Sequence, residues 1–128
     1  SSLSDAMRAK ELGATTLILS NHGGRQLDQT ISPIELLPDV RKAVGDEVEI
    51  IIDGGIRRGT DIFKAIALGA NACSIGRPYL YGLAVDGEAG VVKALEILRE
   101  EFRRTMALMG VTSVDQISAS CLRKRKWQ

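Results

Sequence analysis

The stretch LILSNHGGRQLD, from Leu17 to Asp28, joins an apolar run directly to a group of polar side chains. It contains His22, the only histidine among 128 residues. Histidine is the side chain best suited to accept a proton near neutral pH. Three residues later, Arg25 offers a planar fork that matches a carboxylate. The pair predicts a base beside a carboxylate clamp, which suits a substrate with a C–OH group next to a carboxylate. The alternative interpretation is that His22 merely caps the end of a strand.

Two later loops combine glycine with arginine, and each follows an apolar run. The first, DGGIRRGTD, covers residues 53–61, and the second, IGRP, covers residues 75–78. Glycine lets the backbone approach a ligand, while arginine and a helix N-terminus at Thr60 and Asp61 favour an anion. One such loop is most simply a tight turn with solvated arginines, but the two together indicate a phosphate site. The residues concerned are Gly54, Gly55, Gly59, Arg57, Arg58, Gly76 and Arg77.

The apolar pattern predicts the elements that carry these loops. We expect strands at 15–20, 48–52 and 72–75, the first of them buried on both faces because its apolar run is continuous. Helices are predicted at 4–12, capped by Ser4, and from Pro33 to Ala43, capped by Ser32 and interrupted near Pro38. Further helices are expected from Thr60 to near Gly69, over 87–109, and after Thr112 or Ser113, with loops at 21–31 and 76–82.

Strands that alternate with helices require parallel pairing and right-handed crossovers. A short repeat, LGAT at 12–15 and LGAN at 68–71, marks two similar helix-to-strand junctions. Three strands are too few to close a barrel, so we predict an α/β fold that forms the last three βα units of a (β/α)8 barrel. The alternative is a small three-stranded α/β sandwich. Residues 1–128 are treated as one segment, with a basic tail at 118–128.

The composition narrows the classes of function. Hydrophobic residues make up 45% and charged residues 26% of the chain, and the net charge is +1, which gives no indication of a nucleic-acid partner. Cys73 and Cys121 have no metal-ligand spacing, so we expect free thiols, no metal site and a reducing compartment such as the cytoplasm. Organellar or peripheral membrane association stays open. No apolar run is long enough to span a membrane. The cluster LRKRKWQ at 122–128 is interpreted as a solvated tail, with an anionic surface as the alternative partner.

Three motifs, SNHGGRQLD, DGGIRRGTDIFKAIALGA and IGRPYLYGLAVDGEAGV, resemble the FMN-dependent α-hydroxy-acid oxidase and dehydrogenase family. That family includes glycolate oxidase, L-lactate dehydrogenases, mandelate dehydrogenase and the flavin domain of flavocytochrome b2. The resemblance extends to about Ile117. It implies FMN as cofactor and a small 2-hydroxy acid as substrate, which is oxidised to the 2-oxo acid.

The resemblance also implies roles for the matching residues. His22 would remove a proton from the substrate α-carbon or its hydroxyl, Arg25 would hold the carboxylate, and Ser20 would contact the flavin. The residues implied for the FMN ribityl and phosphate groups are Asp53, Gly54, Gly55, Ile56 and Arg57, with Gly76 and Arg77 completing the phosphate site.

Other parts of the family site have no match in this chain. A lysine near the flavin N1 and the tyrosines around the substrate are missing, and neither Lys10 nor Tyr79 and Tyr81 can replace them. We therefore expect the N-terminal part of the barrel as a partner, a homo-oligomer for the full-length protein, and an inactive isolated chain. The alternatives are a non-catalytic flavin- or phosphate-binding half-barrel that self-associates, and another phosphate barrel such as an IMP dehydrogenase relative, which SNHGGRQ disfavours.

Overall fold

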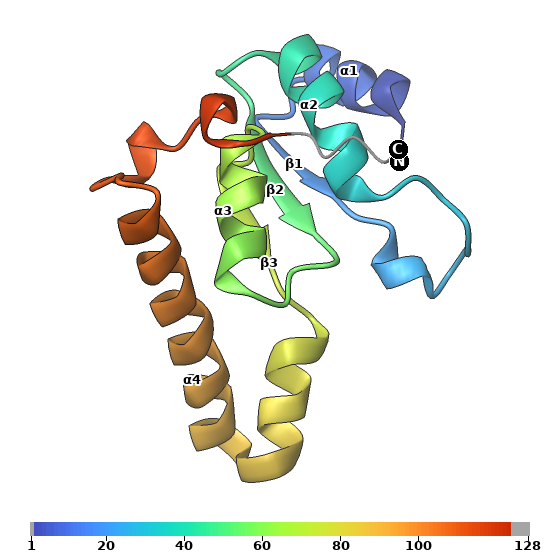
Figure 1. Cartoon of the computed structure of the whole chain (residues 1–128). Helices are drawn as coiled ribbons and strands as arrows, with labels where there is room; N and C mark the ends of the chain where they lie inside the picture. The colour runs from blue at the N-terminus through green and yellow to red at the C-terminus, as the bar shows by residue number, and fades with distance from the viewer. Residues whose placement is uncertain (1, 124–128) are drawn as a thin grey trace, which may run out of the picture.

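The computed structural model describes residues 2–123 and contains one parallel sheet of three strands (Figure 1). The strands are β1 (Thr16–Leu19), β2 (Glu49–Asp53) and β3 (Ala72–Ser74). They lie in the order β1-β2-β3, with Leu19 opposite Ile52 and Ile52 opposite Cys73. All three carboxyl ends therefore meet at one edge of the sheet, as the alternation of helices and strands predicts.

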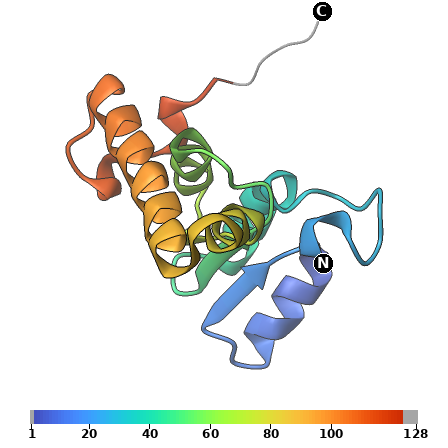
Figure 2. The ribbon, with the colours of Figure 1, turned by 90° about the horizontal axis from the view of Figure 1, so that it is seen from below.

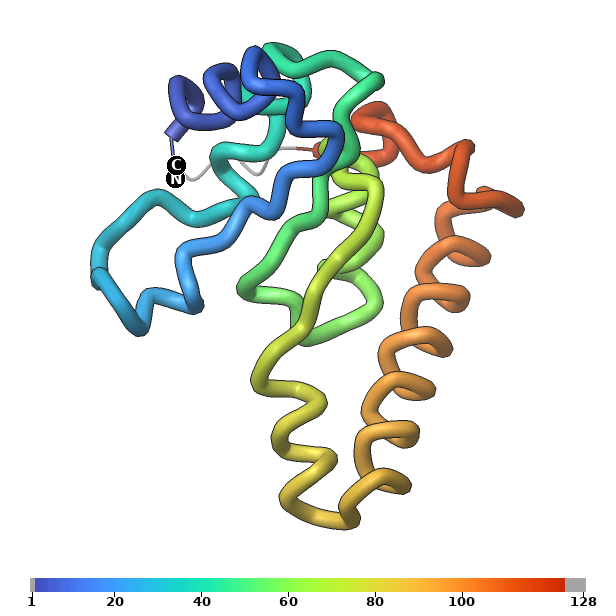
Figure 3. The backbone as a smooth tube through the Cα atoms, turned by 180° about the vertical axis from the view of Figure 1, so that it is seen from behind, coloured from blue at the N-terminus to red at the C-terminus, as the bar shows by residue number. Residues whose placement is uncertain are grey.

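Four helices accompany the strands in the described residues, and the second and third connect the strands along one face of the sheet. The helices are α1 (Leu3–Glu11), α2 (Pro33–Val44), α3 (Gly59–Ala67) and α4 (Arg77–Leu108), with short 3-10 turns η1 (His22–Gly24), η2 (Val114–Gln116) and η3 (Ala119–Cys121). The main core lies between this layer of helices and the sheet. Its largest fully buried side chains are Leu37, Val40, Val44, Ile50 and Ile52. Seen from behind in Figure 3, β2 and β3 run in front of α3.

The opposite face of the sheet is open. Ile18 on β1 is 65% exposed, although the continuous apolar run predicts a strand buried on both faces. That prediction is wrong for the described residues because no helix packs on this side of β1. In a closed (β/α)8 barrel this face lines the interior, where other strands would cover it. The register puts Ile18, Ile51 and Ala72 in one row across the open face, with Asp53 and Ser74 in the row nearest the carboxyl ends.

Glycine ends the helices that lead into β1 and β3 in the same way. After α1, the Gly13 N–H donates to Lys10 O and the Ala14 N–H to Ala9 O; after α3, Gly69 and Ala70 repeat this with Ile66 and Ala65. Gly13 has φ of 91° and Gly69 of 107°, values that only glycine adopts without cost. This is the Schellman arrangement of hydrogen bonds at a helix end. It explains the repeat LGAT and LGAN in the sequence.

A clamp formed by Arg41 ties together the amino ends of β2 and β3. Its Nε donates to Gly69 O (2.8 Å), its Nη1 to Val48 O (2.8 Å) and its Nη2 to Asn71 Oδ1 (2.6 Å). Asn71 Oδ1 also accepts from the Ile50 N–H (2.8 Å). This end of the sheet is thus fixed by internal hydrogen bonds. The loops predicted to carry the functional residues follow the opposite, carboxyl ends of the strands.

Two predicted helix features differ in the structure. Ser2 rather than Ser4 caps α1, because its Oγ accepts from the Asp5 N–H (3.2 Å). Pro38 does not interrupt α2. A proline inside a helix costs about 3 kcal/mol, but Pro38 is exposed while the opposite side of α2 is buried in the core through Leu37 and Val40. Burial of that side stabilises the continuous helix.

The segment GRPYLYG, predicted as a loop, is instead the beginning of α4. Pro78 occupies the first turn, where its fixed φ fits a helix. The helix bends at Asp86 and Gly87 into two arms, 77–85 and 88–108, and Figure 1 shows these arms as a hairpin that extends beyond the sheet. Gly82 and Gly90 let the two arms touch backbone to backbone, since a Cβ on Gly82 would lie 2.3 Å from Gly90 O.

A second, smaller core joins α3, α4 and the last described residues. Phe63 and Ile117 are buried there, and the rings of Phe63 and Phe102 lie 6.5 Å apart. Leu122 packs against this cluster, so the predicted tail begins with packed residues, and its positions 124–128 lie outside the described residues. Figure 2, from below, shows the long arm of α4 beside α3. Within residues 2–123, no helix is long and apolar enough to cross a membrane.

Candidate functional site

Three loops meet at the carboxyl ends of the strands. Between the first two, Ser20 Oγ donates a hydrogen bond to Asp53 Oδ2 (2.6 Å). Between the first and the third, the guanidinium of Arg77 lies so close to Gly23 that a Cβ there would be 3.0 Å from its Nη2. A Cβ on Gly54 would lie 3.5 Å from Asn21 Oδ1. The structure therefore brings all three predicted motifs to one place.

The loop after β1 has an unusual backbone held by its own polar groups. His22 has φ of 53°, which is costly for a residue other than glycine. Ser20 Oγ accepts from the His22 N–H (3.1 Å), and Asn21 Oδ1 accepts from the Gly23 N–H (3.0 Å). These bonds hold the turn in place, while the side chains of His22 and Arg25 are exposed on the same loop. Strained backbone of this kind concentrates at functional sites.

The loop after β2 is anchored by one apolar residue and one carboxylate. Ile56 is buried in the main core, with 6% of its surface exposed. Asp61 Oδ2 accepts from the N–H groups of Arg57 (3.1 Å) and Arg58 (3.0 Å). Gly55 has open space where a Cβ would be, so a ligand can approach its backbone.

The N-terminus of α3 is occupied by the protein's own carboxylates. Glu101 of α4 accepts from the Gly59 N–H (2.9 Å) and from Arg58 Nη1 (2.8 Å), in addition to the bonds made by Asp61. The Gly59 amide and then the Arg58 guanidinium hold the pKa of Glu101 below its usual value, and Glu101 raises the pKa of Arg58. Arg58 and the helix start at Thr60, predicted from the sequence as anion-binding, are thus engaged within the chain.

The loop after β3 leaves its helix start uncapped. Gly76 precedes α4 with no side-chain hydrogen bond to the first turn, and a Cβ on it would have nothing within 4 Å. Free N–H groups at a helix N-terminus and a neighbouring guanidinium, here that of Arg77, attract an anion such as phosphate.

Tyr79 and Tyr81 lie in the first arm of α4 and are exposed.

Cys73 and Cys121 are both free. Burial, followed by the nearby Asp61 carboxylate, raises the pKa of Cys73 to about 11, which makes it a poor nucleophile at neutral pH.

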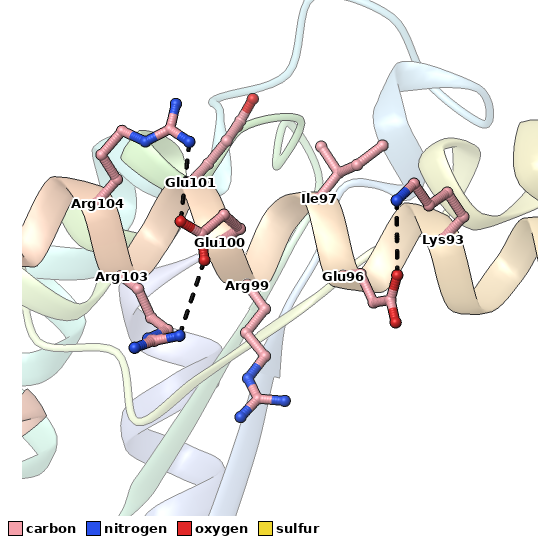
Figure 4. Close-up of a pocket in the computed structure, with 8 residues that line it drawn as sticks. All are labelled: Lys93, Glu96, Ile97, Arg99, Glu100, Glu101, Arg103 and Arg104. Atoms are coloured by element: carbon pink, nitrogen blue, oxygen red, sulfur yellow. Dashed lines mark ion pairs between the residues drawn. The ribbon is translucent and has the colours of Figure 1, made fainter.

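A hollow elsewhere on the surface follows one face of α4 (Figure 4). Its lining consists only of residues 93–104 of that helix, including ion pairs of Glu100 with Arg103 and Arg104 at 3.8 Å. Charged pairs along one exposed helix contribute little binding specificity. We therefore place the candidate site at the three loops.

Sequence reasoning missed two residues that shape the site. Asn21 could have been found from the pattern Asn-x-Gly, which is typical of a side chain that hydrogen-bonds two residues ahead. No sequence pattern pointed to Glu101, because it lies 42 positions after Gly59, the glycine that it contacts.

The family model of the FMN-dependent dehydrogenases matches residues 1–124. The chain belongs to this family. An L-lactate oxidase of Nostoc sp. is 51% identical over 118 residues, which cover 92% of this chain and 32% of that protein. Glycolate oxidase 3 of Arabidopsis thaliana is 52% identical over 123 residues, 96% of this chain and 33% of that protein. The chain thus spans about a third of the length of these curated relatives.

Solved structures of the family confirm the fold. A flavocytochrome b2 variant has a TM-score of 0.89 at 43% identity and matches 94% of this chain and 32% of its own. A mandelate oxidase has a TM-score of 0.88 at 46% identity, over 92% of this chain and 36% of its own. The chain is therefore part of a (β/α)8 barrel, as predicted, and not a small α/β sandwich. FMN is the cofactor of the family, and one solved mandelate oxidase carries an FMN adduct.

Proposed function

We propose that this chain provides the proton acceptor, the carboxylate clamp and the phosphate end of the FMN site in an enzyme that oxidises a 2-hydroxy acid to the 2-oxo acid. The contact between Arg77 and Gly23 carries the proposal. The loop of His22 and Arg25 lies beside an arginine at an uncapped helix start, which supports a site where acid–base chemistry and phosphate binding would share one edge of the sheet. The names of the relatives, lactate oxidase and glycolate oxidase, support the substrate class.

The donor set of the loops fits the phosphate end of FMN. Arg57 and Arg77 supply exposed guanidinium groups, and the first turn of α4 supplies N–H groups that no side chain caps. Gly54, Gly55 and Gly76 would let the ribityl chain and the phosphate lie against the backbone. FMN, when bound, supplies the acceptor for the two electrons that leave the substrate.

Polar groups at the strand ends would complete the cofactor site. Ser20 and Asp53, joined by their 2.6 Å hydrogen bond, lie between the substrate loop and the phosphate loop, where both could contact the flavin. Ile56 contributes by anchoring its loop in the core.

Two side chains of the first loop would act on the substrate. His22 would accept a proton from the α-carbon or the hydroxyl, because it is exposed and histidine is the side chain best suited to this role at neutral pH. Arg25 binds the substrate carboxylate through two parallel N–H donors. The bonds from Ser20 and Asn21 hold the loop that carries both.

The open sheet face favours a role for the chain inside a larger barrel. Ile18 would be covered there by further strands, which we propose also supply the lysine and tyrosines that this chain lacks. The second candidate function is a non-catalytic flavin- or phosphate-binding half-barrel, in which a second copy would cover the same face. We propose that residues 1–128 act as one segment in either case.

The test uses the purified protein that contains this chain. We expect a visible flavin spectrum that bleaches when L-lactate, glycolate or mandelate is added without oxygen. His22→Gln should keep the spectrum of bound FMN and slow the bleaching by about 10²- to 10⁴-fold. Arg99→Lys, on the outer face of α4, is the control and should bleach at the wild-type rate.

Bleaching of His22→Gln at a near-normal rate would contradict the base assignment. Bound flavin that none of the three acids reduces, in protein of a dimer's mass, would favour the half-barrel module instead.

A further inference from the structure

We propose that Glu101 is a positioning residue for the phosphate site, because its carboxylate holds the end of the loop 53–58, which carries Arg57. This inference rests on the proposed function. Glu101 lies on the long arm of α4, ten residues after the last of the three motifs, and we assign it no direct contact with the substrate.

The two oxygens of Glu101 hold two consecutive residues of the loop. Oε2 accepts from the Gly59 N–H at 2.9 Å and Oε1 from Arg58 Nη1 at 2.8 Å. Only 24% of the Glu101 side chain is exposed, so water competes weakly for these bonds. Figure 4 shows Glu101 pointing to the other side of α4 from Arg99. Its carboxylate is directed to the N-terminus of α3, where it meets Gly59 and Arg58.

The loop cannot move away from Glu101 without opening the interface of α3 with α4. The backbone of Gly59 touches α4 so closely that a Cβ would lie 2.1 Å from Phe102 N. Beside this contact, the rings of Phe63 and Phe102 pack together in the smaller core. The position of Gly59, the last fixed point of the loop, is thus set by α4.

The two adjacent arginines of the loop have different partners. Arg58 is paired with Glu101, while Arg57 forms no ion pair within residues 2–123. Arg57 is therefore the arginine of this loop that is free to meet a phosphate. Arg77 opens the first arm of α4 and Glu101 lies on its second arm, and the backbone contact of Gly82 with Gly90 joins the two arms. The hairpin of α4 therefore contributes a residue to each side of the proposed phosphate site.

The experiment compares FMN with riboflavin, which lacks the phosphate. Dissociation constants are measured by flavin fluorescence quenching on the apo form of the protein that contains this chain, for the wild type and for Glu101→Ala and Glu101→Gln. We expect Glu101→Ala to weaken FMN binding by about 10-fold and riboflavin binding by less than about 2-fold. Glu101→Gln keeps an acceptor for the Gly59 N–H, so the FMN affinity of this variant should fall by only about 3-fold.

Glu100→Gln is the matched control. Within residues 2–123, the ion pairs of the neighbouring Glu100 are with Arg103 and Arg104 of its own helix, so both dissociation constants should stay at wild-type values. If Glu101→Ala does not fold, the difference between FMN and riboflavin is read from Glu101→Gln. Equal weakening of both flavins, or an unchanged FMN constant in the variants that fold, overturns the inference and leaves the proposed function intact. A wild-type protein that binds no FMN overturns the proposed function and the inference with it.

Discussion

Replacement of Gly59 by alanine should destabilise the protein because α3 and α4 touch at this residue. The new Cβ would lie 2.1 Å from Phe102 N and 2.3 Å from the Glu101 carbonyl carbon. Both are backbone atoms, so no side chain can turn aside. To reach an ordinary contact of 3.4 Å, the helices must separate by roughly 1.3 Å.

Overpacking of this kind costs about 1–3 kcal/mol, and we expect the upper end because the separation also disturbs the Phe63–Phe102 contact. The assay is urea unfolding followed by far-UV circular dichroism, with the free energy of unfolding taken from the midpoint and slope. Gly76→Ala is the matched control, because its Cβ meets nothing within 4 Å. Gly76→Ala should have the same free energy of unfolding as the wild type. Its effect should be on FMN binding, which it should weaken. Wild-type stability of Gly59→Ala would refute the close contact of the two helices.

Further predictions concern the site and its ionisable groups. Arg25→Lys should raise the KM for the hydroxy acid and slow flavin reduction, because the two-pronged contact is lost; an unchanged steady-state response would contradict the clamp. Cys73, with its pKa of about 11 against an ordinary value of 9.0, should react with iodoacetamide at pH 8 about 100-fold more slowly than free cysteine, as mass spectrometry of a Cys121→Ser variant can test. Because the folded-state pKa of Glu101 is lowered, its stabilising effect is full above the ordinary value of 4.5 and is lost as the pH falls through the folded value. The stability advantage of the wild type over Glu101→Gln should therefore shrink below pH 4.5 in urea titrations, and a constant difference would refute the carboxylate contacts.

The fold was predictable because its signals are local. The apolar runs gave the three strands to within about two residues, and the glycine junctions at Gly13 and Gly69 marked where helices end. Parallel order followed from the alternation of elements. The errors came from contacts between distant residues. Pro38 is tolerated because the core holds the rest of α2, and Gly82 is helical because Gly90 of the other arm meets it.

The meeting of the three loops at one edge of the sheet was predictable from the sequence, whereas the contacts within and between the loops were not. Residues that follow parallel strands must meet at one edge, so Ser20 and Asp53 could be expected near each other, and the structure gives the bond between them. The different partners of Arg57 and Arg58 could not be inferred from the sequence, in which the two residues are adjacent and identical. They depend on Glu101, which only the packing of α4 brings to the loop.

The strands lie side by side in the same order in which they occur along the chain, and this has a consequence for how the protein folds. Each pairing joins neighbouring βα units, so each closes a loop of only one helix and its connections. Closing a loop of this length costs less chain entropy than pairing strands from opposite ends of the chain would. We therefore expect the sheet to grow by accretion, with β2 adding to the free edge of β1 and β3 to that of β2. The loop after β1 would then take shape only once Asp53 is in place to accept the hydrogen bond of Ser20.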